Sequence, residues 1–150
     1  KGDCLRMGDL SLTCLYPDIP KEGESGEEDR NEHSLVLWLE YGSFDMVLTG
    51  DMSQKGEKEI LENTKALKPA EVLKVAHHGS RFSSSEPWLD ALLPGQAVIS
   101  CGENNRYGHP APETVERLME ADVRIYKTPE NGAVILQIKR GKIRVNCWRK

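Results

Sequence analysis

Residues 72–80, VLKVAHHGS, carry an apolar β-type run directly into two histidines, a glycine and a serine. Two imidazoles beside a core are costly unless they have polar or metal partners. Residues 47–51, VLTGD, carry a similar run into a carboxylate, and residues 98–110, VISCGENNRYGHP, lead through a polar loop to a histidine. Three strand ends thus deliver residue types that bind hard or borderline metal ions. These residues are Asp51, His77, His78 and His109.

Length and composition indicate one domain over residues 1–150 with a moderate core. The chain is 38% hydrophobic and 29% charged, a little polar for a compact domain. No run approaches the roughly 20 apolar residues that a membrane span needs. The net charge of −4 argues against a generally basic nucleic-acid binder.

The charges are unevenly distributed. Acidic residues crowd positions 22–32, which predicts a solvated loop. Basic residues crowd the C-terminal end, which predicts either a solvated hairpin or a surface that contacts phosphates. The basic residues considered for nucleic-acid binding are Lys139, Arg140, Lys142 and Arg144.

The four cysteines are scattered and form no CxxC pair, so a zinc knuckle is not expected. Each lies in or beside an apolar run, which predicts small buried side chains and leaves disulfides open. They are Cys4, Cys14, Cys101 and Cys147.

Turn signals and apolar periodicity predict alternating strands and helices in the middle of the chain. The expected strands span residues 12–16, 34–41, 44–49, 72–76, 96–100, 123–127, 133–139 and 143–148. The expected helices span residues 53–63, a stretch from Ser84 or Ser85 to Leu93, and a stretch opened by Pro112. The last helix should bury Val115, Leu118 and Met119 on one face. The pattern predicts an α/β layered sandwich with a mixed sheet and terminal hairpins.

Asp51 has two interpretations of equal weight. It lies just past a strand, where open α/β sheets build their sites, but Gly50–Asp51 can also be a plain turn that caps the next helix. His77 and His78 should point to opposite faces, as successive side chains at a strand end do. One would then face the site, and the other a neighbouring layer or the substrate.

Gly79 suits a close backbone approach to a ligand or a turn of positive φ, and Ser80 leads toward a helix N-terminus that can hold an anion. Simple capping is the competing interpretation of the serine. Asn105 and Arg106 can contact a phosphate or a substrate edge, and the alternative is an ordinary surface loop. His33 is either a further ligand or a solvated histidine.

A serine hydrolase and a P-loop enzyme are both disfavoured. The nucleophile-elbow pattern G-x-S-x-G does not occur, and neither does GxxxxGK[ST].

In their order and spacing, LTGD, KVAHHGS, AVIS and NNRYGHP resemble the metallo-β-lactamase superfamily. More narrowly, they resemble the C-terminal domain of ComEC-type competence DNA-uptake proteins, as does the run NEHSLVLWLEYGSFDMVLTGD. The resemblance covers about residues 5–145. It implies a two-metal hydrolase on an αβ/βα sandwich.

The resemblance also implies roles for individual residues. Asp51 corresponds to the metal-bridging carboxylate, His77 and His78 to metal and substrate ligands, and His109 to a late histidine ligand. Asp51 and His78 are the expected catalytic residues. The implied ions, zinc or manganese, would activate water and neutralise the charge on a phosphodiester.

One departure from the family pattern is large. The first metal motif of the family, HxHxDH or HxDxDH, is absent from this sequence. The chain begins at Lys1, shows no leader and resembles the middle of a domain. We therefore expect a C-terminal fragment with part of the metal shell, with weak or no metal binding and no nuclease activity by itself.

In the intact protein, we expect a metal-dependent phosphodiesterase that acts on DNA during competence DNA uptake. The expected location is a soluble domain of a bacterial cytoplasmic-membrane protein, on its outer face. The expected partners are DNA, the remainder of the same protein, and a second copy of the fragment. The alternatives are a soluble hydrolase of a small phosphodiester or ester, and a degenerate domain that binds DNA without cutting it.

Overall fold

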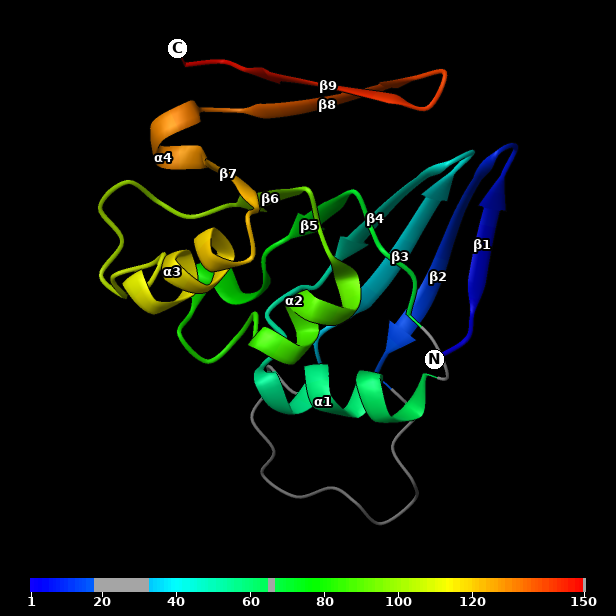
Figure 1. Ribbon diagram of the computed structural model, residues 1–150, viewed down its shortest axis with the longest axis horizontal. Coiled ribbons are helices and arrows are strands. Elements are labelled where there is room, and N and C mark those ends of the chain that lie inside the picture. The colour runs from blue at the N-terminus through cyan, green and yellow to red at the C-terminus, as the bar shows by residue number, and fades with distance from the viewer. Residues whose placement is uncertain (18–32, 65–66, 150) are drawn as a thin grey trace.

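A mixed α/β fold is described by the computed structural model for residues 1–17, 33–64 and 67–149 (Figure 1). The acidic loop predicted at residues 22–32 lies outside the described residues. The main sheet has seven strands, and a two-stranded hairpin stands apart from it. The strands of the main sheet are β1 (Cys4–Met7), β2 (Leu10–Tyr16), β3 (Val36–Tyr41), β4 (Phe44–Leu48), β5 (Val72–Lys74), β6 (Gln96–Ile99) and β7 (Arg124–Lys127). The hairpin consists of β8 (Val134–Lys139) and β9 (Lys142–Cys147).

The order of strands in the main sheet follows their order in the chain. Strands β1 to β4 pair antiparallel, and β4 to β7 pair parallel. The predicted mixed sheet is therefore confirmed, and each predicted strand is present within about two residues. Strand β1 was not predicted, because its four residues are all exposed and give no apolar alternation.

Three helices connect the parallel strands: α1 (Gln54–Asn63), α2 (Glu86–Leu92) and α3 (Pro112–Glu120). Their starts follow from the sequence, since the Ser53 hydroxyl accepts a hydrogen bond from the Lys55 amide, and prolines occupy the first turns of α2 and α3. The buried face predicted for the last helix is wrong for Met119, which is 66% exposed. Met119 lies about 100° round the helix from the buried Leu118.

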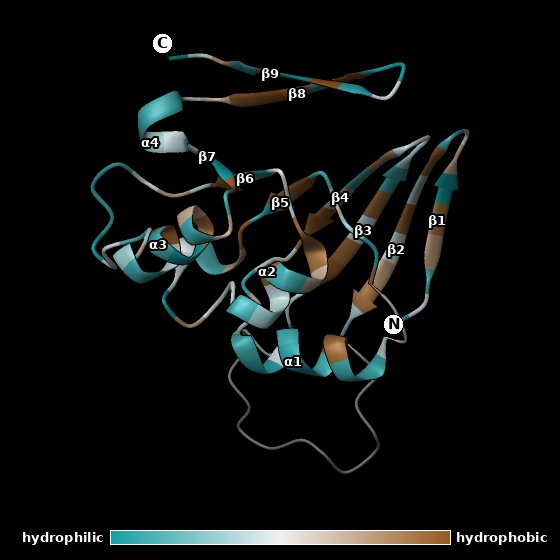
Figure 2. Cartoon of the chain, in the orientation of Figure 1, coloured by the Kyte–Doolittle hydropathy of each residue, from teal (hydrophilic) through white to brown (hydrophobic). Residues whose placement is uncertain are grey.

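The core lies between the helices and one face of the sheet. From the sheet, Trp38, Val47 and Leu73 pack in the same cluster as Ile60 of α1 and Trp88 of α2. Because side chains alternate along a strand, their neighbours Leu37, Leu39, Met46 and Leu48 belong to the opposite face, where they are only half-buried. Figure 2 shows the hydrophobic colouring of these strands.

Strands β8 and β9 continue from a short helix, α4 (Thr128–Asn131). They form the predicted terminal hairpin, which lies along one margin of the molecule (Figure 1). No helix among the described residues is long and apolar enough to cross a membrane. The four cysteines are unpaired. The prediction that they are buried is wrong for Cys4, which is exposed, and the other three are half-buried.

Candidate functional site

Asp51 lies in the turn between β4 and α1. Gly50 has φ of 52°, and its carbonyl accepts a hydrogen bond from the His77 amide at 3.0 Å. The Asp51 amide donates to the Ser34 hydroxyl at 3.1 Å. Because Ser53, rather than Asp51, caps α1, the Asp51 carboxylate has no capping role, and its side chain is 45% exposed. The turn therefore presents a carboxylate at the carboxyl end of the parallel sheet.

His77 and His78 lie in a 3₁₀ turn, η2 (Ala76–Gly79), directly after β5. Both residues have left-handed backbone conformations, with φ of 46° and 57°. The expectation that they point to opposite faces of a strand is wrong, because the strand has already ended at Lys74. Their ring centroids are 6.4 Å apart. The turn places the two imidazoles on neighbouring positions of one loop.

One hydrogen bond and one close approach define the chemistry of His78. Its Nδ1 lies 2.6 Å from the Ser100 carbonyl oxygen. Because a carbonyl can only accept, the neutral ring must carry its proton on Nδ1, which leaves a lone pair on Nε2. That Nε2 is 3.7 Å from Oδ1 of Asp51. An imidazole lone pair and a carboxylate oxygen thus lie beside each other at the end of the sheet.

His109 approaches from the loop after β6. Its ring centroid is 5.7 Å from that of His77. Asn105 holds this loop: its side-chain amide donates to the His109 carbonyl at 2.6 Å, and its amide oxygen accepts from the His109 N–H at 2.9 Å. Nδ1 of His109 is buried and has no hydrogen-bond partner. Burial, followed by the nearby rings of His77 and His78, lowers the pKa of His109, which favours the neutral ring.

Arg106 and Tyr107 form the exposed tip of this loop. The Arg106 guanidinium lies 5.1 Å from the Tyr107 ring centroid and donates to its hydroxyl at 3.0 Å. The Tyr107 ring stacks on His109 at 6.0 Å and is 68% exposed. Sequence reasoning overlooked Tyr107, although an aromatic residue two positions before a candidate ligand was a usable signal. A cavity of about 330 Å³ opens here, lined by His78, Ser100, Cys101, Gly102, Asn105, Tyr107 and His109.

Gly79 and Ser80 are occupied by contacts within the protein. A Cβ on Gly79 would lie 2.7 Å from Cβ of Pro110, so the close approach predicted for this glycine is to the His109 loop. Ser80 is 4% exposed, and its hydroxyl accepts from the Phe82 amide at 3.3 Å. Both residues are buried beneath the loops that carry the histidines.

The segment after Ser80 is held from two sides by side chains that sequence reasoning missed. The buried Glu57 carboxylate of α1 accepts from the amides of Ser84 and Ser85 at 2.5 and 2.8 Å. From α3, the Arg117 guanidinium donates to the carbonyls of Ser83 and Ser84 at 2.8 and 2.9 Å. Burial raises the pKa of Glu57 despite these hydrogen bonds. We call this arrangement the Glu57–Arg117 clamp.

The structure brings the four predicted metal ligands to one end of the sheet in pairs. Asp51 approaches His78, and the His77 ring lies near the rings of both His78 and His109. Across the described residues, no three His, Cys, Asp or Glu side chains are close enough to hold one ion. The predicted further ligand, His33, is exposed.

Lys74 also faces this region. It is half-buried at the end of β5, and its ammonium donates to the Val75 carbonyl at 2.8 Å. Burial lowers the pKa of Lys74, against the attraction of Asp51.

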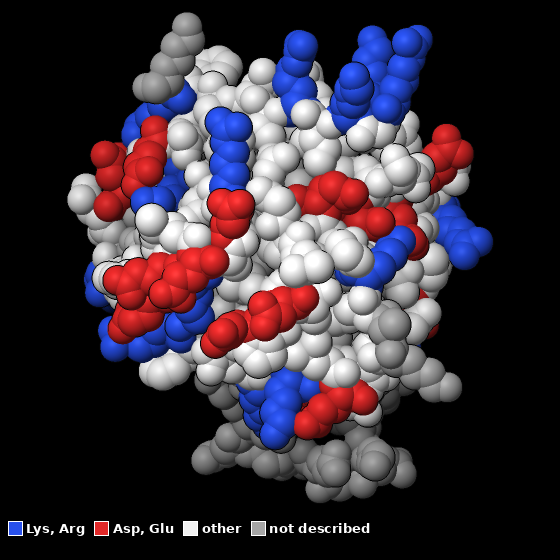
Figure 3. All heavy atoms as spheres, viewed as in Figure 1, with Lys and Arg blue, Asp and Glu red and all other residues white. Residues whose placement is uncertain are grey.

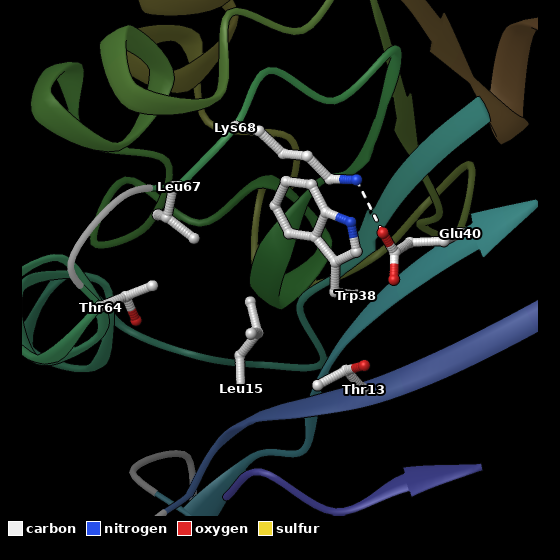
Figure 4. Close-up of a pocket in the computed structure, with 7 residues that line it drawn as sticks. All are labelled: Thr13, Leu15, Trp38, Glu40, Thr64, Leu67 and Lys68. Carbon is white, nitrogen blue, oxygen red and sulfur yellow. Dashed lines mark hydrogen bonds and ion pairs between the residues drawn. The ribbon is translucent and has the colours of Figure 1, made fainter. Parts of the chain in front are cut away.

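Another hollow, of about 270 Å³, lies at the other end of the sheet (Figure 4). Lys68 lies 5.7 Å from the Trp38 ring centroid and pairs with Glu40 at 2.7 Å. Because Lys68 and Glu40 already pair with each other, the hollow is a weaker candidate for a functional site than the end of the sheet that holds the histidines. Its lining consists of Thr13, Leu15, Trp38, Glu40, Thr64, Leu67 and Lys68.

Comparison with known proteins gives three informative matches. The chain is 38% identical over 139 residues to ComE operon protein 3 of Bacillus subtilis, covering 93% of the chain. It is 33% identical to competence protein ComA of Neisseria gonorrhoeae over 81% of the chain. It is 38% identical to recombination protein 2 of Haemophilus influenzae over 79% of the chain. These matches make the chain a relative of ComEC-type competence proteins.

The similarity to ComEC-type proteins concerns a part of them. The chain covers 17%, 18% and 14% of the lengths of these three relatives. No protein-family model matches the chain. The matches span the segments that hold Asp51 and the three histidines, because 139 of the 150 residues align with the first relative.

Proposed function

We propose that this chain carries part of the divalent-metal site of a phosphodiesterase that cuts DNA during competence DNA uptake. The observation that carries the proposal is the approach of His78 Nε2 to Asp51 Oδ1 at 3.7 Å, with the other ring nitrogen engaged by Ser100. Ligating histidines commonly use their second nitrogen for such a hydrogen bond to a carbonyl. The competence names of the relatives supply the biological setting.

The donor set fits a divalent ion in kind but is incomplete in number. Carboxylate and imidazole donors suit zinc, manganese or iron. His109 adds a buried Nδ1 that has no hydrogen-bond partner, and its lowered pKa favours the neutral ring that a ligand requires. We propose that a preceding segment of the intact protein supplies the remaining ligands through an HxHxDH or HxDxDH motif, as the resemblance implies.

The chemistry is hydrolysis of a phosphodiester: a water oxygen bonds to phosphorus, the ester P–O bond breaks, and the leaving oxygen takes a proton. A bound divalent ion neutralises phosphate charge and makes water a better nucleophile. Asp51 Oδ1 and His78 Nε2 lie 3.7 Å apart as two donor atoms for such an ion. The Ser100 carbonyl fixes the orientation of the His78 ring. Arg106, at the exposed tip of the loop, can contact a phosphate oxygen.

The proposal extends to fold and location. The seven-stranded sheet with helices on one face would be the C-terminal half of an αβ/βα metallo-β-lactamase sandwich. Its other half would cover the half-buried sheet face that includes Leu39 and Met46. The intact protein would sit in the bacterial cytoplasmic membrane, with this domain on the outer face. Both statements rest on the resemblance.

A nuclease assay tests the proposal. A longer protein that contains the upstream motif is incubated with labelled single- and double-stranded DNA and with manganese or zinc. We expect cleavage that is lost in Asp51→Asn and retained in Asp90→Asn. Asp90 is a matched control, because it is an exposed carboxylate on α2.

Two outcomes would count against the proposal. Cleavage that survives Asp51→Asn would remove Asp51 from the site. No cleavage with either metal would favour a small-ester hydrolase or a non-catalytic DNA-binding domain.

For the 150-residue chain alone we expect weak or no metal binding, and tight binding of two ions by calorimetry would contradict that expectation.

A further inference from the structure

The hairpin of β8 and β9 has two different faces. Its inward positions are apolar and half-buried, whereas its outward positions are exposed. The outward positions and the turn carry four cations, which we call the basic strip. The basic strip consists of Lys139, Arg140, Lys142 and Arg144.

The pairing of the hairpin concentrates these charges. Lys139 lies directly opposite Lys142, and Gln137 lies opposite Arg144. Like charges in directly opposite positions destabilise a pair of strands. No Asp or Glu occurs between Val134 and Cys147 to offset them. The hairpin therefore carries a local excess of positive charge in a chain whose net charge is −4.

Several basic residues elsewhere are paired with acids. Lys68 pairs with Glu40 and Asp45, and Lys127 pairs with Glu130. Among the ion pairs of the described residues, none includes a residue of the basic strip. Its charge is left to interact with a ligand.

The hairpin reaches from the loop after β6, which carries His109, to the turn between β3 and β4. At one end, Arg149 lies 3.5 Å from Glu103 of the site loop and donates to the Pro129 carbonyl. At the other end, Gly141 approaches the Ser43 hydroxyl in the turn between β3 and β4. A six-residue strand spans about 20 Å. The basic strip thus begins at the turn of the hairpin, beside Ser43, and runs along the hairpin toward the candidate site.

We propose that the basic strip binds the phosphate backbone of a single-stranded nucleic acid and guides it toward the histidine site. This inference rests on the proposed function for its choice of DNA. The two-stranded hairpin presents its positive charges in one narrow line. Such a line matches the phosphate backbone of a single nucleic-acid strand. Trp148, which follows β9 and is 82% exposed, adds an aromatic face on which a base can stack.

A linear polyanion fits this surface better than an anionic bilayer does. Figure 3 shows basic side chains gathered along the margin of the molecule where the hairpin lies, with acidic groups across the adjacent surface. A flat anionic surface would meet both, whereas a strand can follow the basic line alone. We therefore assign the strip to a nucleic-acid strand, and vesicle binding becomes an outcome of the test.

The test uses the 150-residue chain and a fluorescent single-stranded oligonucleotide in a binding titration. The strip variant is Lys139→Gln, Arg140→Gln, Lys142→Gln and Arg144→Gln. The matched control removes four exposed cations outside the hairpin: Arg6→Gln, Lys55→Gln, Lys58→Gln and Arg124→Gln. Both variants have a net charge of −8, that is −4 less four positive charges.

We expect the strip variant to bind about tenfold or more weakly, while the control stays close to the unchanged chain. The slope of log K against log salt should fall in magnitude by about 2.8, or about 0.7 for each phosphate that the strip no longer neutralises. A milder variant, Lys139→Gln with Lys142→Gln, relieves the like-charge pair and guards against a folding defect. Equal weakening in strip and control variants would overturn the proposal, as would strip-dependent binding only to anionic vesicles.

Asp51→Asn separates this proposal from the proposed function. Binding that needs the basic strip but survives Asp51→Asn supports the strip even if no hydrolysis is ever found. In the longer protein, we expect the strip variant to lose activity on long DNA and keep activity on bis(p-nitrophenyl) phosphate. Equal loss on both substrates would overturn the role of the strip while leaving the phosphodiesterase intact.

Discussion

A single hydrogen bond gives His78 a definite protonation pattern. Because the Ser100 carbonyl accepts from Nδ1 at 2.6 Å, we predict the Nδ1–H tautomer, with Nε2 unprotonated, whenever the ring is neutral. Long-range ¹H–¹⁵N correlation spectra distinguish the two tautomers directly. A spectrum dominated by the Nε2–H form would show that the Ser100 contact does not control the ring. It would also weaken the assignment of Nε2 as a ligand atom.

Gly79 gives a second prediction at the scale of one residue. In Gly79→Ala, the positive φ of 85° costs about 1–2 kcal/mol, and the 2.7 Å approach to Pro110 adds about 1–3 kcal/mol of overpacking. The control Gly42→Ala has φ of 61° and nothing within 4 Å, so it should lose only the first contribution. Urea unfolding measures both. Equal losses would mean that the contact with Pro110 is easily relaxed.

Helix α1 contributes a carboxylate that makes stability depend on pH. Burial raises the pKa of Glu57, so the folded protein binds this proton more tightly than the unfolded chain does. Its stabilising contribution is complete below the unfolded value of about 4.5 and declines as pH rises through the raised folded pKa.

Relative to Glu57→Gln, the unchanged chain should therefore lose unfolding free energy as the pH rises above about 4.5. Urea midpoints at pH 4, 5, 6 and 7 for both proteins test this. Parallel curves would show that Glu57 titrates normally. Glu57→Ala, which leaves the amides of Ser84 and Ser85 without acceptors, should cost about 1–3 kcal/mol for each amide left unsatisfied.

The elements that sequence reasoning found are those with local signals. Alternation marks β3 and β4, and Ser53 and Pro112 mark the starts of α1 and α3. The left-handed backbone of His77 and His78 carries no such signal, because neither residue is a glycine. The pairing of Glu57 with a loop 27 residues away depends on the folded structure and has no local pattern.

The candidate site divides in the same way. The identities of Asp51, His77, His78 and His109 follow from three strand ends, and the structure gathers them at the end of the sheet. Their orientation did not follow, since it depends on Ser34, Ser100 and Asn105. These partners come from other parts of the chain and act through hydrogen bonds that no sequence motif encodes.

The whole molecule leaves apolar side chains on the sheet face opposite the helices. Leu5 and Met7 of β1, which belong to this face by the strand register, are 58% and 57% exposed. Such a surface favours association, so we predict that the isolated chain forms reversible dimers.

Light scattering over a range of concentrations measures this association. Leu5→Lys with Met7→Lys should shift the chain toward monomer, whereas Leu93→Lys with Met119→Lys should not. Leu93 and Met119 are 65% and 66% exposed but belong to the helical side. A monomer at every concentration would exclude the predicted dimer.

The order of the seven strands has a consequence for synthesis. Each strand of the main sheet pairs with the strand made just before it, from β1 to β7. A chain leaving the ribosome N-terminus first therefore has a partner waiting for every new strand, and no gap in the sheet has to be held open for a later one. Because only consecutive strands pair, no strand has to close a loop that spans another strand of the sheet, which limits the entropy lost at each addition. During synthesis, each new strand can therefore pair with the edge strand that was made just before it.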